Sequence, residues 1–169
     1  MNDAPSYIEF LVGVMEDALN NEDFRAELDQ CPAEYQHTVR NGWMCVLGWA
    51  FDVAIHQCFS DDATGTAVLK TTVQRNAARK DWFDAKLCEA MNPHIYALMP
   101  GAWANKGELG LSYPIAEWLL AMTMVDNAID LTKYNPGFGF GVFFSLYIPS
   151  LIIEVRDRTN KILANQPSS

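Results

Sequence analysis

The spacing of apolar and polar residues predicts helices along most of this chain. Ser6-Tyr7-Ile8-Glu9 has the pattern of a capping box, in which a serine hydroxyl and a glutamate satisfy free amides at a helix start. The helix that it would open has apolar residues every three or four positions: Ile8, Leu11, Val12, Met15 and Leu19. Asn20-Asn21 ends this helix and can cap a short second one, with Phe24 and Leu28 facing inward.

A third helix, at about residues 32–59, is predicted to be the central buried helix. Pro32 suits its first turn, where no backbone N–H is needed. At 100° per residue, its polar and small residues fall in one narrow arc. This arc, which we call the polar seam, consists of His37, Asn41, Cys45, Gly48, Asp52 and His56. The rest of the circumference is apolar and includes Val39, Trp43, Val46, Leu47, Ala50, Phe51, Val53 and Ala54.

Turn signals divide the second half of the chain. A loop is expected at 60–65 and a helix at 66–80, followed by a helix that Asp81 caps and that runs through Met91. A short helical turn is expected between Asn92-Pro93 and Pro100-Gly101. A loop at 102–111 and a helix at 113–133, capped by Ser112, are expected to follow. The stretch GFGFGVFFSLYIP suits a strand as well as an apolar helix. Because a single strand would have no partner, we expect a buried helix from near Gly141, kinked at Pro149.

These elements predict an all-α protein, a bundle of about six or seven helices. The length of 169 residues fits one domain, which we place at 1–164, with a disordered tail at 165–169. The composition is 50% hydrophobic and 20% charged, as in an ordinary globular chain.

The net charge of −9 is concentrated at the amino terminus. Residues 1–34 hold nine acids against Arg25 alone, a charge of −8, whereas the remaining residues are nearly balanced at −1. A field of this sign repels nucleic acid and anionic membranes and attracts a basic partner. The interrupted basic run from Lys70 to Lys86 is interpreted as a solvated helix face. It could also pair with the acidic helices of the same molecule or of a neighbouring one, and in the second case it would favour a homodimer.

The four cysteines show no C-x-x-C pair and no zinc-like spacing with the histidines, so free thiols and a cytoplasmic location are expected. The longest uncharged stretch, residues 135–153, is broken by prolines and glycines and predicts buried core rather than a membrane span.

The candidates for chemistry are few. Glu34-x-x-His37 has the spacing of a di-iron ligand pair, but such bundles need the pair twice and the second copy is missing. Asp52 and His56, one turn apart, would supply two members of a hydrolase triad without specifying the nucleophile. No phosphate-binding or dinucleotide motif is present. We therefore expect no cofactor, no metal and no catalytic residue, and we interpret the seam first as a strip of solvent or a close helix contact, with a local hydrogen bond between Asp52 and His56.

Two functional hypotheses remain. The first is a non-catalytic protein that engages a basic, nucleic-acid-binding surface of a partner protein, as inhibitors of the immunity or anti-defence type do. Its partner-binding residues would be Glu9, Glu16, Asp17, Glu22, Asp23 and Glu27. The alternative is a helical bundle that binds a small ligand or a metal along the seam, with His37, Asp52 and His56 as its candidate residues.

Overall fold

The predicted all-α fold class is confirmed. The computed structural model describes residues 4–109, 112–126, 129–130, 132, 134 and 138–165. Within this part of the chain the regular elements are helices and no strand occurs. They are α1 (Ala4–Leu19), α2 (Glu22–Gln30), α3 (Ala33–His56), α4 (Asp62–Ala77), α5 (Ala85–Leu109), α6 (Ser112–Val125), α7 (Phe138–Val142), a π-helical turn η1 (Phe143–Tyr147) and α8 (Ile148–Ala164).

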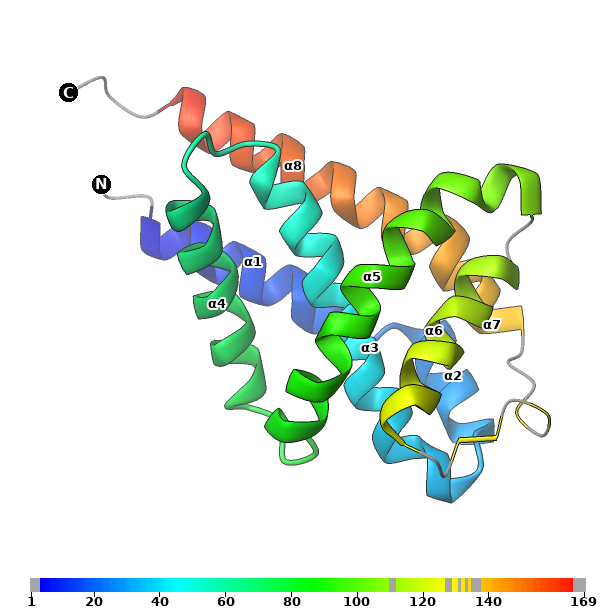
Figure 1. Cartoon of the computed structure of the whole chain (residues 1–169). Coiled ribbons are helices and arrows are strands. Elements are labelled where there is room, and N and C mark those ends of the chain that lie inside the picture. Colours follow the sequence, from blue (N-terminus) through cyan, green and yellow to red (C-terminus); the bar gives the residue numbers. More distant parts are fainter. Residues whose placement is uncertain are drawn as a thin grey trace.

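Helix α3 is the central element, as its pattern predicts. It contacts α1, α2, α4, α5, α6 and α8, and Figure 1 shows it crossing the middle of the molecule. Pro32 is its N-cap residue, and the helix ends at His56, close to the predicted end. None of the helices in the described ranges is long and apolar enough to cross a bilayer.

An aromatic cluster holds one face of α3. Trp43 is fully buried and stacks on Phe24 of α2, with ring centroids 4.3 Å apart. Trp118 of α6 and Phe144 of η1 meet the Trp43 ring edge-on, at 5.6 and 5.5 Å. Since Trp43 lies two positions after Asn41, the two side chains leave opposite sides of the helix. The aromatic face therefore fixes the rotation of α3 and leaves the polar seam directed toward α4 and α5.

The predicted caps are partly right. Asn21 caps α2, its Oδ1 accepting a hydrogen bond of 3.0 Å from the Phe24 amide. Ser6 does not cap α1, because that helix already begins at Ala4. Helix α4 begins at Asp62 instead of Thr66, since the Asp61 carboxylate accepts a hydrogen bond from the Ala63 amide at 3.0 Å and so satisfies an amide of the new first turn.

The predicted breaks at Pro93 and Pro100 are wrong. Helix α5 runs through both prolines and extends over most of the loop expected at 102–111. A stripe of fully buried side chains at intervals of three or four continues past both prolines: Met91, Ile95, Met99 and Ala102. The burial of this stripe stabilises the helix by more than the hydrogen bonds that the prolines remove.

The last helices also depart from the predicted boundaries. Helix α6 ends at Val125 instead of near residue 133, and the chain then turns back to α3, where the Asp130 amide donates to the Tyr35 hydroxyl at 3.2 Å. The described part of the ambiguous stretch, residues 138–149, is helical, as preferred, and η1 comes just before Pro149, which lies in the first turn of α8. Residues 166–169 of the predicted tail lie outside the described residues.

Candidate functional site

The polar seam of α3 lies against the segment that joins α4 to α5 and against the first half of α5. Asn41 contacts the backbone at Trp82 and Asp84, Cys45 contacts Cys88, and Asp52 contacts Tyr96. Each partner follows its seam residue by 41 to 44 positions, so the seam and this segment run alongside each other. Of the two alternatives, a strip of solvent or a close helix contact, these contacts support the helix contact.

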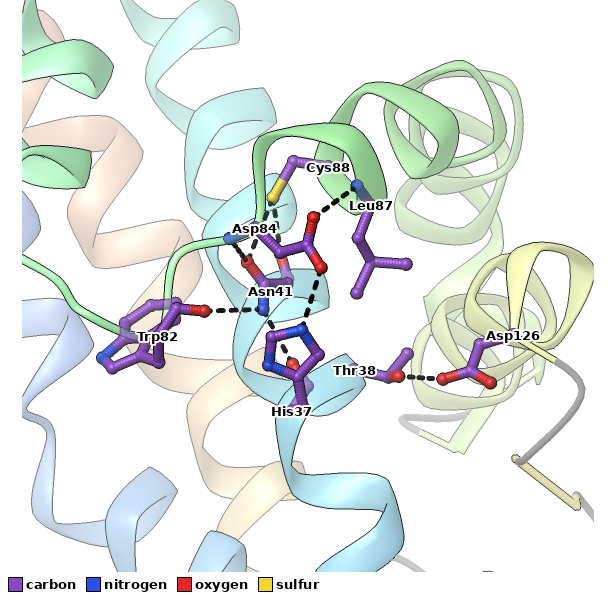
Figure 2. Close-up of polar contacts among 8 residues, drawn as sticks. All are labelled: His37, Thr38, Asn41, Trp82, Asp84, Leu87, Cys88 and Asp126. Atoms are coloured by element: carbon purple, nitrogen blue, oxygen red, sulfur yellow. Dashed lines mark hydrogen bonds and ion pairs between the residues drawn. The ribbon is translucent and has the colours of Figure 1, made fainter.

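Asn41 is the most fully engaged residue of the seam. Its side-chain amide is completely buried, donates to the carbonyl oxygens of His37 at 2.9 Å and Trp82 at 3.2 Å, and accepts from the Asp84 amide at 2.8 Å. The Cys88 thiol donates to the same amide oxygen at 3.4 Å. Figure 2 shows these contacts converging on one side chain. Asn41 thus attaches the α4–α5 connection to the central helix.

Asp84 extends this network to the surface. Its Oδ1 accepts from the Leu87 amide at 3.0 Å and so caps α5, and its Oδ2 lies 3.0 Å from Nε2 of His37 (Figure 2). The hydrogen bond from His37, followed by that from the Leu87 amide, lowers the pKa of the Asp84 carboxyl. His37 is about half exposed, so it acts here as a surface residue that holds Asp84, the cap of α5, in place. A separate contact in the same view joins α3 to the residue after α6, where the Thr38 hydroxyl donates to Asp126.

At the other end of the seam Asp52 links α3 to α5. One carboxylate oxygen pairs with Nδ1 of His56, and the other accepts a hydrogen bond of 2.6 Å from the Tyr96 hydroxyl of α5. Burial alone would lower the pKa of His56, but the hydrogen bonds and charge of Asp52 outweigh burial and raise it. Burial, and then the hydrogen bond to Asp52, raise the pKa of Tyr96, so its hydroxyl stays protonated.

The raised pKa of His56 makes this contact pH-dependent. A group whose pKa is higher in the folded state stabilises the fold below its unfolded pKa, about 6.5, and loses that effect as the pH rises through the folded value. We expect Asp52→Asn to lower the free energy of unfolding more at acidic than at alkaline pH, by a difference of up to about 1 kcal/mol. Urea denaturation of both proteins, once below pH 6.5 and once well above the raised pKa of His56, measures it, and an equal loss at both pH values would contradict the pairing.

Thr66 is the residue placed to act as the nucleophile beside His56 and Asp52, but its surroundings argue against catalysis. The Thr66 hydroxyl lies 3.5 Å from Nε2 of His56, at the limit of a hydrogen bond. Thr66 is the fifth residue of α4, so its own amide belongs to the helix and is not free to stabilise an oxyanion. The His56 ring instead packs on Gly65, where an added Cβ would lie 3.0 Å from Nε2. The arrangement fits a contact between α3 and α4.

The seam residues do not converge on one ligand. His37 and His56 are separated by nineteen helical steps, or about 28 Å along the axis. Among the described residues, no group of three or more His, Cys, Asp or Glu side chains could hold a metal ion.

A cavity lies over the middle of the seam, between α3, α4 and α5, with a volume of about 490 Å³. Cys45 and Gly48 of α3 line it, together with Leu69 and Val73 of α4 and Tyr96 of α5. An added Cβ at Gly48 would meet no atom within 4 Å, so this glycine leaves the space open. The sequence pattern located Cys45 and Gly48, but not the residues from α4 and α5.

The acidic residues at the amino terminus have partners within the chain. Helix α1 packs on α4, and there Arg75 pairs with Glu9 at 2.8 Å and Lys80 pairs with Glu16. This confirms one of the two interpretations of the basic run, pairing within the same molecule. Two of the six predicted partner-binding carboxylates thus already have a basic partner within the chain, although Glu9 remains exposed.

The other predicted acidic residues lie at the end of α1 and on α2. Asp17, Glu22 and Asp23 are exposed, and Glu27 is half-buried. No lysine or arginine of the described chain pairs with the three exposed ones. A second cavity beside α2, of about 310 Å³, is lined by Arg25 and Arg40 as well as Asp29, so the surface here is of mixed sign.

Comparisons with protein families, with curated proteins and with solved structures found no match to this chain.

Proposed function

We propose that this protein binds a small, mainly apolar molecule in the cavity between α3, α4 and α5. The cavity itself is the observation that carries the proposal. Its volume of about 490 Å³ lies within the range of about 300–1,000 Å³ typical of small-molecule sites. It occupies the part of the seam that the helix contacts do not fill, since Asn41 is enclosed on one side of it and Asp52 is bonded to Tyr96 on the other.

The lining indicates the chemistry of the ligand. The walls are mostly aliphatic, aromatic or sulfur-containing side chains, among them Met44, Leu69, Val73 and Phe83. Two exposed residues of opposite charge, Lys70 on α4 and Glu89 on α5, also line the space. A ligand with an apolar body and one polar or charged group would therefore fit best, with its body against α3 and its polar group toward solvent.

A fluorescent apolar anion, anilinonaphthalene sulfonate, tests this site directly. We expect the folded chain to bind one molecule saturably, with enhanced fluorescence. In Gly48→Phe the new ring would project into the open space, and binding should weaken at least about tenfold, or about 1.4 kcal/mol.

Gly13→Phe is the matched control. Gly13 also has no atom within 4 Å of an added Cβ, and it lies exposed on α1, away from the cavity. This variant should bind the probe like the parent chain while carrying the same cost of a glycine replaced within a helix. Equal binding by Gly48→Phe and Gly13→Phe would place the probe elsewhere and contradict the proposal.

The second candidate is docking of a basic protein partner, in the manner of an immunity or anti-defence inhibitor, and the exposure of Asp17, Glu22 and Asp23 favours it. Glu9, Glu16 and Glu27 would contribute less, because the first two already pair with α4 and the third is half-buried. Reversing Asp17, Glu22 and Asp23 to lysine should abolish capture of such a partner, and added salt should weaken it. Capture that survives both changes would exclude this candidate.

A further inference from the structure

Two cysteines from different helices meet at the wall of the cavity. Cys45 of α3 and Cys88 of α5 are both buried, and both line the cavity. The Cys45 thiol donates to the Cys88 carbonyl oxygen at 3.8 Å, and the Cys88 thiol donates to the Asn41 side chain one turn earlier on α3. A small molecule in the cavity would therefore lie against both cysteines, which are otherwise buried.

The other two cysteines are held apart from this pair. The Cys58 thiol donates to the carbonyl oxygens of Ala54 and Arg156, both at 3.4 Å. Cys31 is buried beside Tyr134, and burial is the main cause that raises the pKa of its thiol. Among the described residues, Cys45 and Cys88 are thus the pair of thiols positioned to react with each other.

We propose that Cys45 and Cys88 form a disulfide that links α3 to α5 when a small-molecule disulfide enters the cavity. One protein thiol, on losing its proton, attacks a sulfur of the small disulfide, and half of that molecule leaves as a thiol. The second protein thiol attacks the protein sulfur of this mixed disulfide and releases the other half as a thiol. Two protein thiols are oxidised, one small disulfide is reduced to two thiols, and the two protons pass to these products.

The environment of the pair indicates a slow reaction. The interaction with the neighbouring Cys88 side chain, and then burial, raise the pKa of Cys45, so the reactive thiolate is scarce at neutral pH. Asn41 accepts from the Cys88 thiol at 3.4 Å and keeps Cys88 beside the seam. The pair is consequently expected to stay reduced until an oxidant is concentrated in the cavity. This inference holds whether or not the cavity has a natural ligand.

Incubation of the reduced, folded full-length chain with hydroxyethyl disulfide tests the proposal. After alkylation of the remaining thiols and proteolysis, peptide mass mapping should find Cys45 joined to Cys88, with the mass of two hydrogen atoms lost. The linked chain should unfold at a temperature roughly 5–10 °C higher, because the link closes the loop of residues 45–88. Linkage through Cys31 or Cys58, or alkylation of all four cysteines, would overturn the proposal.

Serine variants provide the controls. Cys31→Ser and Cys58→Ser should form the same link as the parent chain. Cys45→Ser should form none and should show no rise in melting temperature, while circular dichroism verifies that it is folded. A rise of the same size in Cys45→Ser would show that the oxidant acts elsewhere. Mapping of the parent chain decides the question by itself if that variant does not fold.

Discussion

Replacing Asn41 by leucine is expected to lower the free energy of unfolding by about 2–4 kcal/mol. Leucine has a similar size but offers no hydrogen bond, so the Trp82 carbonyl oxygen, the Asp84 amide and the Cys88 thiol would each lose a partner. Each buried polar group left unsatisfied costs about 1–3 kcal/mol, and the partial exposure of Trp82 and Asp84 places the sum in the lower part of the combined range.

Asn160→Leu is the matched control, because Asn160 lies exposed in α8. It should change the free energy of unfolding by no more than about 0.5 kcal/mol. Urea denaturation of the parent chain and both variants measures the difference. If Asn41→Leu were as stable as Asn160→Leu, the α4–α5 connection would not depend on this side chain, and the seam would have another explanation.

Much of the fold follows from local patterns. The position of α3, its buried apolar circumference and its seam follow from helical periodicity between Pro32 and His56. The cap at Asn21 was predictable because a side-chain oxygen before a helical run acts within a single turn. Such signals depend on neighbouring residues and are therefore visible in the sequence.

The continuity of α5 was not predictable from the same local rules. Pro93 and Pro100 each remove a backbone hydrogen bond. Without knowledge of the tertiary packing, each proline therefore predicts the end of a helix. The competing signal is the apolar series of Met91, Ile95 and Met99, whose burial depends on α3 and α6 being in place. Tertiary packing decided the outcome, as it does for most helices in proteins.

In the candidate site, too, local spacing was predictable and tertiary packing was not. Helical spacing placed Cys45, Gly48, Asp52 and His56 on one face, but it could not identify what covers them. Tyr96 lies between Pro93 and Pro100, where only a helical turn was expected, so the wrong boundary of α5 concealed the partner of Asp52. Cys88 lies in the helix that was predicted through Met91, but no local pattern shows that this helix packs on α3 beside Cys45.

The charge distribution predicted the acidic amino-terminal segment but not which of its carboxylates are paired within the chain. The excess of acids at residues 1–34 is real, but its sign alone does not show whether a carboxylate faces solvent or a neighbouring helix. The packing of α4 on α1 brings Arg75 and Lys80 to Glu9 and Glu16. The exposed Arg75–Glu9 pair contributes little stability, at most about 1 kcal/mol, whereas the Lys80–Glu16 pair is partly buried. Both pairs reduce the field available to an external partner.

The prediction with the largest functional effect is that Gly48→Phe abolishes occupancy of the cavity. A phenyl ring attached at Gly48 has open space ahead of it and enters the volume between Leu69 and Tyr96 that a ligand would need. It leaves the hydrogen bonds of Asn41 and Asp52 unaltered, so the helix contacts along the seam should persist. Circular dichroism and urea denaturation should therefore show a folded protein close in stability to Gly13→Phe.

Native mass spectrometry of the protein isolated from its own cells shows whether the cavity between α3, α4 and α5 holds a ligand. We expect the parent chain and Gly13→Phe each to carry one small molecule per chain, and Gly48→Phe to have the mass of the bare polypeptide. A parent chain with no bound molecule, or a Gly48→Phe variant carrying the same molecule as the parent, would contradict a ligand site between α3, α4 and α5.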